Sequence, residues 1–200
     1  ITGASGSIYG YRLLEVLSEG FNVHLVISPS GYLVLKEELG ITKEDINKKF
    51  PQVKLIPHSR IDSYLASGSR LCKFRGVIVA PCSMSTLSCV ANGINQNLIH
   101  RVCEVALKEK VPLILLVREM PYSVIHIENM LKVAKAGAVV MPASPGFYHR
   151  PKSVEELVDF VVGKVLDSLR IEHELYQRWK SKPVEDKGDN VTHKAERETY

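Results

Sequence analysis

A charged pair, Arg118-Glu119, directly follows the apolar run Val-Pro-Leu-Ile-Leu-Leu-Val at residues 111–117. An arginine suits bidentate contact with a phosphate, and a glutamate suits proton transfer. The alternative interpretation is a structural ion pair at the end of a strand. Because the pair stands directly after a predicted buried strand, we favour a pair that acts on a ligand.

Hydroxyl and glycine residues follow three other predicted strands. The sequence after Thr2 is Gly-Ala-Ser-Gly-Ser, Ser28 follows a strand predicted over residues 21–27, and Ser-Met-Ser-Thr occupies residues 83–86. Glycine lets the backbone approach a ligand closely, and N–H groups at a helix start attract phosphate. The alternatives are a tight strand–helix turn, a turn serine and a helix cap. A cap needs only one hydroxyl, so the three hydroxyls at 83–86 favour a ligand.

The loop over residues 142–151 is rich in proline and glycine and has aromatic and basic residues near its end. This composition is typical of a loop shaped over a site, although His149 alone is more typical of an exposed loop residue than of a catalyst. Together these segments predict a site for a phosphate-bearing ligand. The sequence contains no G-x-S-x-G nucleophile elbow and no Cys/His cluster with the spacing of a metal site.

The hydrophobic pattern predicts a scaffold that brings these strand ends together. Apolar runs at residues 76–80, 111–117 and 138–141 are typical of strands buried on both faces of a parallel sheet. Strands are also predicted over 21–27 and 53–56. Helices are predicted over 7–17, 32–39, 43–50, 86–91, 96–108, 124–136 and 153–169, the last with a capping box of Ser153 and Glu156.

Strands that alternate with helices through short connections predict an α/β fold with a doubly wound parallel sheet and helices on both faces. The 200 residues, 45% of them hydrophobic, predict one domain over residues 1–179. Ile1-Thr2-Gly3 has the character of a strand end, so we expect the first strand to be truncated at the N-terminus. The polar residues 180–200 are predicted to be disordered, with an oligomer contact as the alternative.

Composition excludes several classes of protein. A net charge of +4, without a basic stripe, does not indicate a nucleic-acid binder and fits a small anionic ligand. We find no apolar run long enough to span a membrane and no secretory signal. Four scattered cysteines indicate small buried residues in a reducing compartment, so we expect a cytoplasmic protein.

Five segments of the sequence resemble the UbiX-type flavin prenyltransferase family, in matching order and spacing over residues 1–179. They are ITGASGSIYGYRLLEVL, PCSMSTLSCVANGINQNLIHR, EVALKEKVPLILLVREMP, IHIENMLKVAKAGAVVMPASPGFYHRP and YQRW. The resemblance implies a flavodoxin-like (Rossmann-like) homododecamer that transfers a dimethylallyl group from dimethylallyl phosphate to reduced FMN. Transfer to N5 precedes ring closure at C6, no metal is needed, and the prenylated FMN serves a UbiD-type decarboxylase.

The resemblance also implies residue roles. It places FMN contacts at Gly3, Ala4, Ser5, Ser28, Ser83, Met84, Ser85, Thr86 and Arg118. It places contacts to the donor phosphate at Arg101, Lys108, Arg118, Tyr148 and Lys164, and an aromatic wall of the prenyl site at Trp179. The catalytic set that it implies is Ser5, Glu38, Lys108, Glu119 and Tyr148.

Within that set, Ser5 and Glu38 would relay the N5 proton, and Glu119 would protonate the leaving phosphate. A solvated helix face is the alternative for Glu38, which lies beside Glu37, and an exposed lysine is the alternative for Lys164. Many family members have arginine at position 164, so a lysine here keeps the charge and loses the guanidinium fork.

Two further functions compete with prenyl transfer. A cysteine decarboxylase of related fold needs a histidine near the first helix, where this chain has Tyr9 and Tyr11, and a P-x-M-N-x-x-M segment, which is missing. An FMN carrier subunit would need neither Glu119 nor Lys108 nor Tyr148. An older interpretation, direct decarboxylation of aromatic acids, would release carbon dioxide without a partner enzyme. The sequence leaves open whether the donor is a phosphate or a pyrophosphate.

Overall fold

Two parallel sheets form the centre of the computed structural model, which describes residues 1–179. The tail predicted to be disordered, residues 180–200, lies outside the described residues. Strand β1 (His24–Leu25) pairs with β2 (Lys54–Leu55), and β3 (Val77–Cys82), β4 (Leu113–Val117) and β5 (Val139–Pro142) form the second sheet in that order. In register, Val117 lies opposite both Cys82 and Pro142, so the three strands end at one edge.

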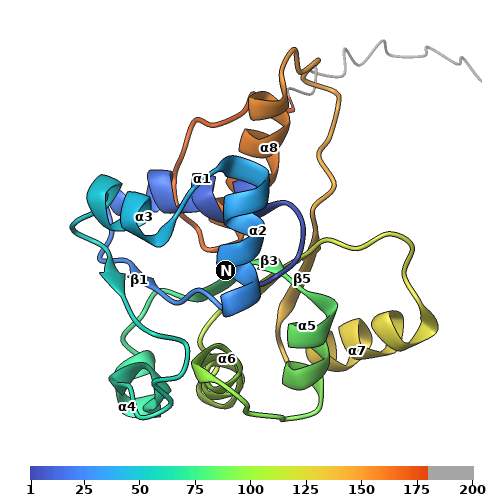
Figure 1. Ribbon diagram of the computed structural model, residues 1–200. Coiled ribbons are helices and arrows are strands. Elements are labelled where there is room, and N and C mark those ends of the chain that lie inside the picture. The colour runs from blue at the N-terminus through green and yellow to red at the C-terminus, as the bar shows by residue number, and fades with distance from the viewer. Residues whose placement is uncertain (180–200) are drawn as a thin grey trace, which may run out of the picture.

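Helices cover both faces of the larger sheet (Figure 1). Alternate residues of β4 show this directly, because Leu113, Leu115 and Val117 belong to one buried cluster and Ile114 and Leu116 to another. The predicted doubly wound α/β class is therefore confirmed. The helices are α1 (Ser7–Ser18), α2 (Pro29–Leu39), α3 (Lys43–Lys49), α4 (Gly68–Leu71), α5 (Met84–Ala91), α6 (Leu98–Glu109), α7 (Val124–Lys135) and α8 (Val154–Ser168), with a 3₁₀ turn η1 (Tyr64–Ala66).

Several predicted boundaries were wrong, and local hydrogen bonds explain the differences. Helix α2 begins at Pro29, three residues ahead of the helix predicted over 32–39, because the Ser28 hydroxyl caps it by accepting from the Gly31 N–H at 3.0 Å. The capping box of α8 is incomplete. Ser153 accepts from the Glu156 N–H at 3.3 Å, whereas the Glu156 carboxylate accepts from the Lys152 N–H at 2.8 Å. Strand β3 continues through Pro81, whose carbonyl accepts from the Thr2 N–H at 3.2 Å.

The first two residues connect the two sheets. The Ile1 amine donates to the Val26 carbonyl at 2.9 Å, and the Ile1 carbonyl accepts from the Ser28 N–H at 3.1 Å. Thr2 bonds to Pro81 on the other side. Ile1 and Thr2 therefore lie between the residues that follow β1 and Pro81 of β3.

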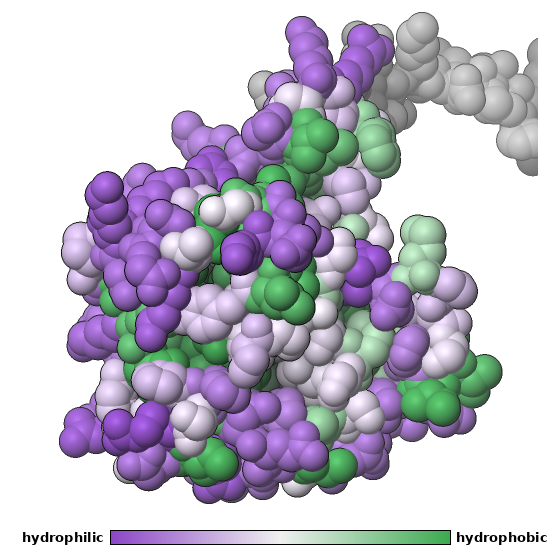
Figure 2. Space-filling model, in the orientation of Figure 1, coloured by the Kyte–Doolittle hydropathy of each residue, from purple (hydrophilic) through white to green (hydrophobic). Residues whose placement is uncertain are grey.

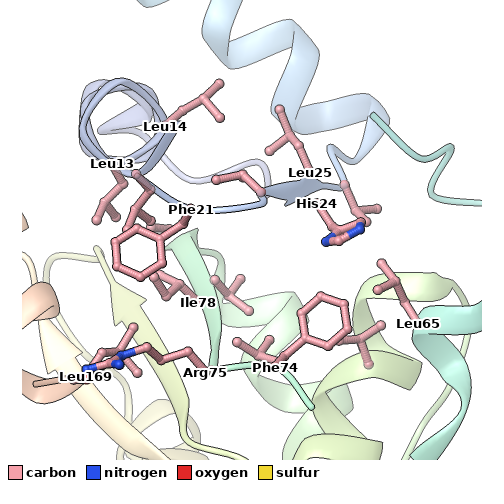
Figure 3. A pocket seen from close by; sticks show the side chains of 18 of the residues that line it. Leu13, Leu14, Phe21, His24, Leu25, Leu65, Phe74, Arg75, Ile78 and Leu169 are labelled. Atoms are coloured by element: carbon pink, nitrogen blue, oxygen red, sulfur yellow. Dashed lines mark hydrogen bonds between the residues drawn. The ribbon is translucent and has the colours of Figure 1, made fainter. Parts of the chain in front are cut away.

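An apolar cavity of about 490 Å³ lies between β1 and β3, next to Ile1. Figure 3 shows side chains from Leu13, Phe21, Leu25 and Ile78 directed toward it from both sides. Its walls are therefore strand edges and core side chains.

The cysteines only partly match the expectation of buried residues. Cys82 and Cys103 are buried, and Cys89 is half-buried, but Cys72 is exposed at the end of the short helix α4. Within residues 1–179 no helix is long and apolar enough to cross a membrane.

Candidate functional site

The shared strand edge positions the first group of predicted site residues. Arg118 follows β4, Ser83 follows β3, and the Arg118 Nε donates to the Ser5 carbonyl at 3.2 Å. Gly6 has φ of +94°, in the left-handed region that favours glycine, and a β-carbon there would lie 3.9 Å from Arg118 Cγ. The loop at residues 3–7 therefore packs directly against Arg118.

Glu38, near the end of α2, binds the same loop. Its carboxylate accepts from the Gly6 N–H at 3.0 Å, the Ser7 N–H at 2.8 Å and the Ser7 hydroxyl at 2.7 Å. Burial opposes ionisation, but the Ser5 and Ser7 hydroxyls and the Ser7 and Gly6 N–H groups outweigh it, so the pKa of Glu38 lies below its ordinary value. The Glu38 side chain is exposed, as the solvated-face alternative expects, but its carboxylate is hydrogen-bonded to the start of α1.

The starts of α2 and α5 flank the beginning of the loop. Ser28 is buried, and its hydroxyl lies 3.1 Å from that of Ser30. A β-carbon on Gly3 would collide with Ser30, so the backbone at Gly3 has no room for a side chain. The Ser83 N–H donates to the buried Thr2 hydroxyl at 2.8 Å. Two helix N-termini, which favour anions, therefore lie beside Thr2 and Gly3.

The three hydroxyl side chains at residues 83–86 have different surroundings. Ser83 caps α5, accepting from the Thr86 N–H at 3.2 Å and lying 3.1 Å from its hydroxyl. Thr86 and Met84 are buried, and Ser85 is exposed. The capping alternative is thus correct for Ser83, and Ser85 is the exposed hydroxyl at this helix start.

Glu119 lies half-exposed beside Arg118 without pairing to it. Its carboxylate accepts from the Met120 N–H at 3.0 Å. Among the ion pairs of residues 1–179, none joins Glu119 to Arg118, so the structural ion pair considered from the sequence is not formed. The guanidinium of Arg118 makes its one described hydrogen bond, to Ser5, through Nε.

An aromatic group occupies the loop after β5. The Tyr148 ring lies edge-on to Trp179 at 5.3 Å between ring centres and to Phe160 at 5.7 Å. His149 stacks on Phe160 at 5.3 Å, and both of its ring nitrogens are buried without a hydrogen-bond partner in the described chain. The expectation of an exposed His149 was wrong. A small hollow of about 200 Å³, open to solvent, is lined by Tyr148, His149, Gln177, Arg178 and Trp179.

Lys108 and Arg101 are not brought to the strand-end edge. Lys108 lies at the end of α6, which leads into the first residue of β4, and its Nζ pairs with Glu109 at 3.0 Å. Arg118 follows the last residue of β4, at the other edge of the sheet. Arg101 pairs with Glu104 at 2.6 Å on the same helix α6. Lys108 and Arg118 of one chain therefore belong to opposite edges.

Lys164 also has a partner in the structure. Its Nζ lies 3.6 Å from the Asp167 carboxylate on α8. No group of three or more potential metal ligands occurs in residues 1–179. Sequence reasoning missed Thr2, Ser7 and Asp167, whose contacts are made across the fold and leave no local pattern.

Comparison with known proteins gives consistent matches over this chain. The Flavoprotein family model matches residues 1–166. A protein from Aquifex aeolicus named flavin prenyltransferase UbiX is 61% identical over 181 residues, covering 90% of this chain and 96% of the relative.

Two solved structures are also similar. A crystal structure of AnUbiX (PadA1) in complex with FMN and dimethylallyl pyrophosphate has a TM-score of 0.85 at 34% identity, covering 90% of this chain and 95% of that one. A dodecameric FMN-dependent UbiX-like decarboxylase from Escherichia coli O157:H7 has a TM-score of 0.84 at 35% identity, covering 90% and 96%.

Proposed function

The chain belongs to the UbiX family of flavin prenyltransferases, and on this premise we propose that it joins the dimethylallyl group of dimethylallyl phosphate to reduced FMN at the strand-end edge. The related AnUbiX structure contains FMN and a dimethylallyl donor. Membership of this family favours prenyl transfer over cysteine decarboxylation and over FMN storage.

One observation carries the proposal for this chain. Arg118 binds the loop at residues 3–7 through the Ser5 carbonyl, and this loop lies beside the starts of α2 and α5. Glu119 is the next residue after Arg118. A guanidinium and two helix N-termini form a donor set that fits the phosphate of FMN. The FMN contacts proposed here are Gly3, Ala4, Ser5, Ser28, Ser83, Met84, Ser85, Thr86 and Arg118.

Reduced FMN, when bound, supplies a nucleophilic N5 and then C6. The Ser5 hydroxyl, one of the groups that lower the pKa of Glu38, and the Glu38 carboxylate would accept and relay the proton that N5 loses as the new C–N bond forms. The C–O bond of the donor breaks in that step, and its electron pair leaves with the phosphate. Glu119 protonates this leaving group, so charge does not accumulate on it.

The donor phosphate is assigned to the aromatic end of the site. Tyr148 and Lys164 stabilise the departing phosphate, and Trp179 forms an aromatic wall of the prenyl pocket. Tyr148 and Trp179 already pack against each other at 5.3 Å. Whether the donor is a phosphate or a pyrophosphate is decided by offering both under identical conditions.

The role of Glu119 provides a direct test. Glu119→Gln removes the proton and keeps the shape, so formation of prenylated FMN should slow about a hundredfold, the size typical of a lost general acid. The rate is followed by chromatography of the released flavin, with Glu19→Gln, an exposed residue after α1, as the matched control. A normal rate in Glu119→Gln would exclude this role, and no product from the wild type with either donor would exclude prenyl transfer.

We also propose that the protein acts as a homo-oligomer, as a dodecamer by analogy with the E. coli structure. Helix α7 and its flanks expose large apolar side chains, which Figure 2 shows as green areas on the surface. Such a patch is typical of a protein interface. The exposed residues are Met120, Val124, Ile125, Ile127 and Leu131.

Assembly would also explain the position of Lys108, because a second copy could bring its α6 to the site. Mixed oligomers test this. Ser5→Ala and Lys108→Ala, each impaired alone, should recover activity when refolded together, because some sites then combine intact Ser5 and Lys108. No recovery would exclude the proposal that Lys108 acts on the site of a neighbouring copy. The product is proposed to serve a UbiD-type decarboxylase, which a coupled assay would check.

A further inference from the structure

Residues 171–179, called the strap below, leave the end of α8 and turn back along this helix. A β-carbon on Gly163 would collide with Tyr176 and His173, so the strap packs on the bare backbone of α8 at this point. The Tyr176 ring lies 4.8 Å from that of Phe160. The strap ends with Trp179 against Tyr148, so it supplies part of the wall of the small aromatic hollow.

One carboxylate fastens the strap to the helix. Asp167 accepts from His173 Nε2 at 3.1 Å, the Tyr176 hydroxyl at 2.6 Å and the Arg178 guanidinium at 2.8 Å. These three donors come from the start, middle and end of the strap. The same carboxylate lies 3.6 Å from Lys164 Nζ, on its own helix.

The electrostatic environment of Asp167 keeps its carboxylate charged. Burial opposes ionisation of Asp167, but the hydrogen bonds from Arg178 and Tyr176 outweigh it and hold its pKa below the ordinary value. Burial and the neighbouring Asp167 charge together raise the pKa of Tyr176 to about 12. The carboxylate is therefore charged, and the phenol keeps its proton, across the neutral range.

We propose that Asp167 is a positioning residue for the prenyl donor. By fastening the strap it holds Trp179 against Tyr148, and it pairs with Lys164, the cation proposed to bind the donor phosphate. Loss of the carboxylate should loosen the aromatic wall and misplace the cation together. The inference rests on the proposed prenyl transfer, but the fastening itself does not.

The chain contains one tryptophan, Trp179, which makes the strap directly observable. In Asp167→Asn the amide nitrogen faces donors that previously met a carboxylate oxygen, so the strap should detach. The nanosecond anisotropy decay of Trp179, measured without ligands, should then gain a fast component. Asp159→Asn is the matched control, because Asp159 is also an ion-paired residue of α8 but bonds to Arg12 at 2.7 Å.

Kinetic measurements distinguish a role of Asp167 in positioning the donor site from a general role in stability. Asp167→Asn should raise KM for dimethylallyl phosphate about tenfold, as expected for a lost charge-assisted contact, with the FMN dissociation constant within about twofold of wild type. The proposal would be overturned if Asp167→Asn kept the Trp179 anisotropy and the donor KM of the wild type. It would also be overturned if the variant lost affinity for the donor and for FMN to the same extent. If the variant fails to fold, Tyr176→Phe must show the same pattern in weaker form. If the wild type transfers no prenyl group, the anisotropy still tests the fastening.

Discussion

Replacing Glu38 by glutamine is expected to weaken the loop at residues 3–7 and everything bound to it. The carboxylate accepts from the Gly6 N–H, the Ser7 N–H and the Ser7 hydroxyl at 2.7–3.1 Å. A glutamine keeps one acceptor oxygen and turns an amide donor toward the remaining N–H groups. The variant therefore loses charge-assisted bonds and gains a donor–donor conflict.

The magnitude follows from the number of bonds and their exposure. A hydrogen bond to a charged group contributes roughly 1.5–3 kcal/mol, but Glu38 is largely exposed, so solvent screening reduces each contribution. We expect a loss of about 1.5–2 kcal/mol in the free energy of unfolding. A similar loss in loop positioning would weaken FMN binding about tenfold to thirtyfold.

Two titrations measure this prediction. Urea unfolding gives the stability, and quenching of flavin fluorescence gives the FMN dissociation constant. Glu37→Gln, the neighbouring exposed residue, is the matched control and should change neither. Wild-type FMN affinity in Glu38→Gln, or an equal effect of Glu37→Gln, would refute the reasoning.

Substitution of Ser5 and Ser7 distinguishes a proton-relay role of Glu38 from a purely structural role. Ser7→Ala removes a bond to Glu38 but leaves Ser5, so it should lower stability more than the rate of prenyl transfer. Ser5→Ala should lower the rate more than stability. If the two variants behave alike, the relay through Ser5 is not supported.

Three further predictions follow from single contacts. The pKa of Asp167 is depressed in the folded chain, so its contribution to stability is fully present above the ordinary pKa near 3.9. This contribution is lost only as pH falls through the lower pKa of the folded state. The fluorescence anisotropy of Trp179 should therefore not change between pH 7 and pH 4. Gly10→Ala should cost about 1–3 kcal/mol in urea unfolding, since its β-carbon would collide with the Ala80 carbonyl of β3. Cys72 should react first with a thiol reagent under native conditions, because it is exposed, whereas burial raises the pKa of Cys103 to about 12.

The scaffold was predictable because its central strands are buried on both faces. The apolar run that became β4 is buried throughout, and the second half of β3 is buried beside it, as expected for strands inside a covered parallel sheet. The same expectation was wrong for β5, whose Val139 and Pro142 are exposed at the edge of the sheet. The edge that collects Ser83 and Arg118 follows from this topology. The length of β1 was not predictable, since the alternation over residues 21–27 indicates a strand, whereas hydrogen bonds support only His24–Leu25.

The contacts between side chains were less predictable. Glu38 was identified only through family resemblance, because its binding to Gly6 and Ser7 joins residues more than thirty positions apart. Asp167 has no motif of its own and gains its role from the return of the strap along α8. The separation of Lys108 from Arg118 depends on which way α6 runs, and it becomes apparent only when the strand register is known.

The most direct test of prenyl transfer is an anaerobic incubation of the purified protein with reduced FMN and dimethylallyl phosphate, followed by mass analysis of the released flavin. The proposed function predicts a flavin heavier than FMN by one C5H8 unit, formed by the wild type and strongly reduced in Glu119→Gln. Unmodified FMN, released from protein that is folded and flavin-bound, would contradict it.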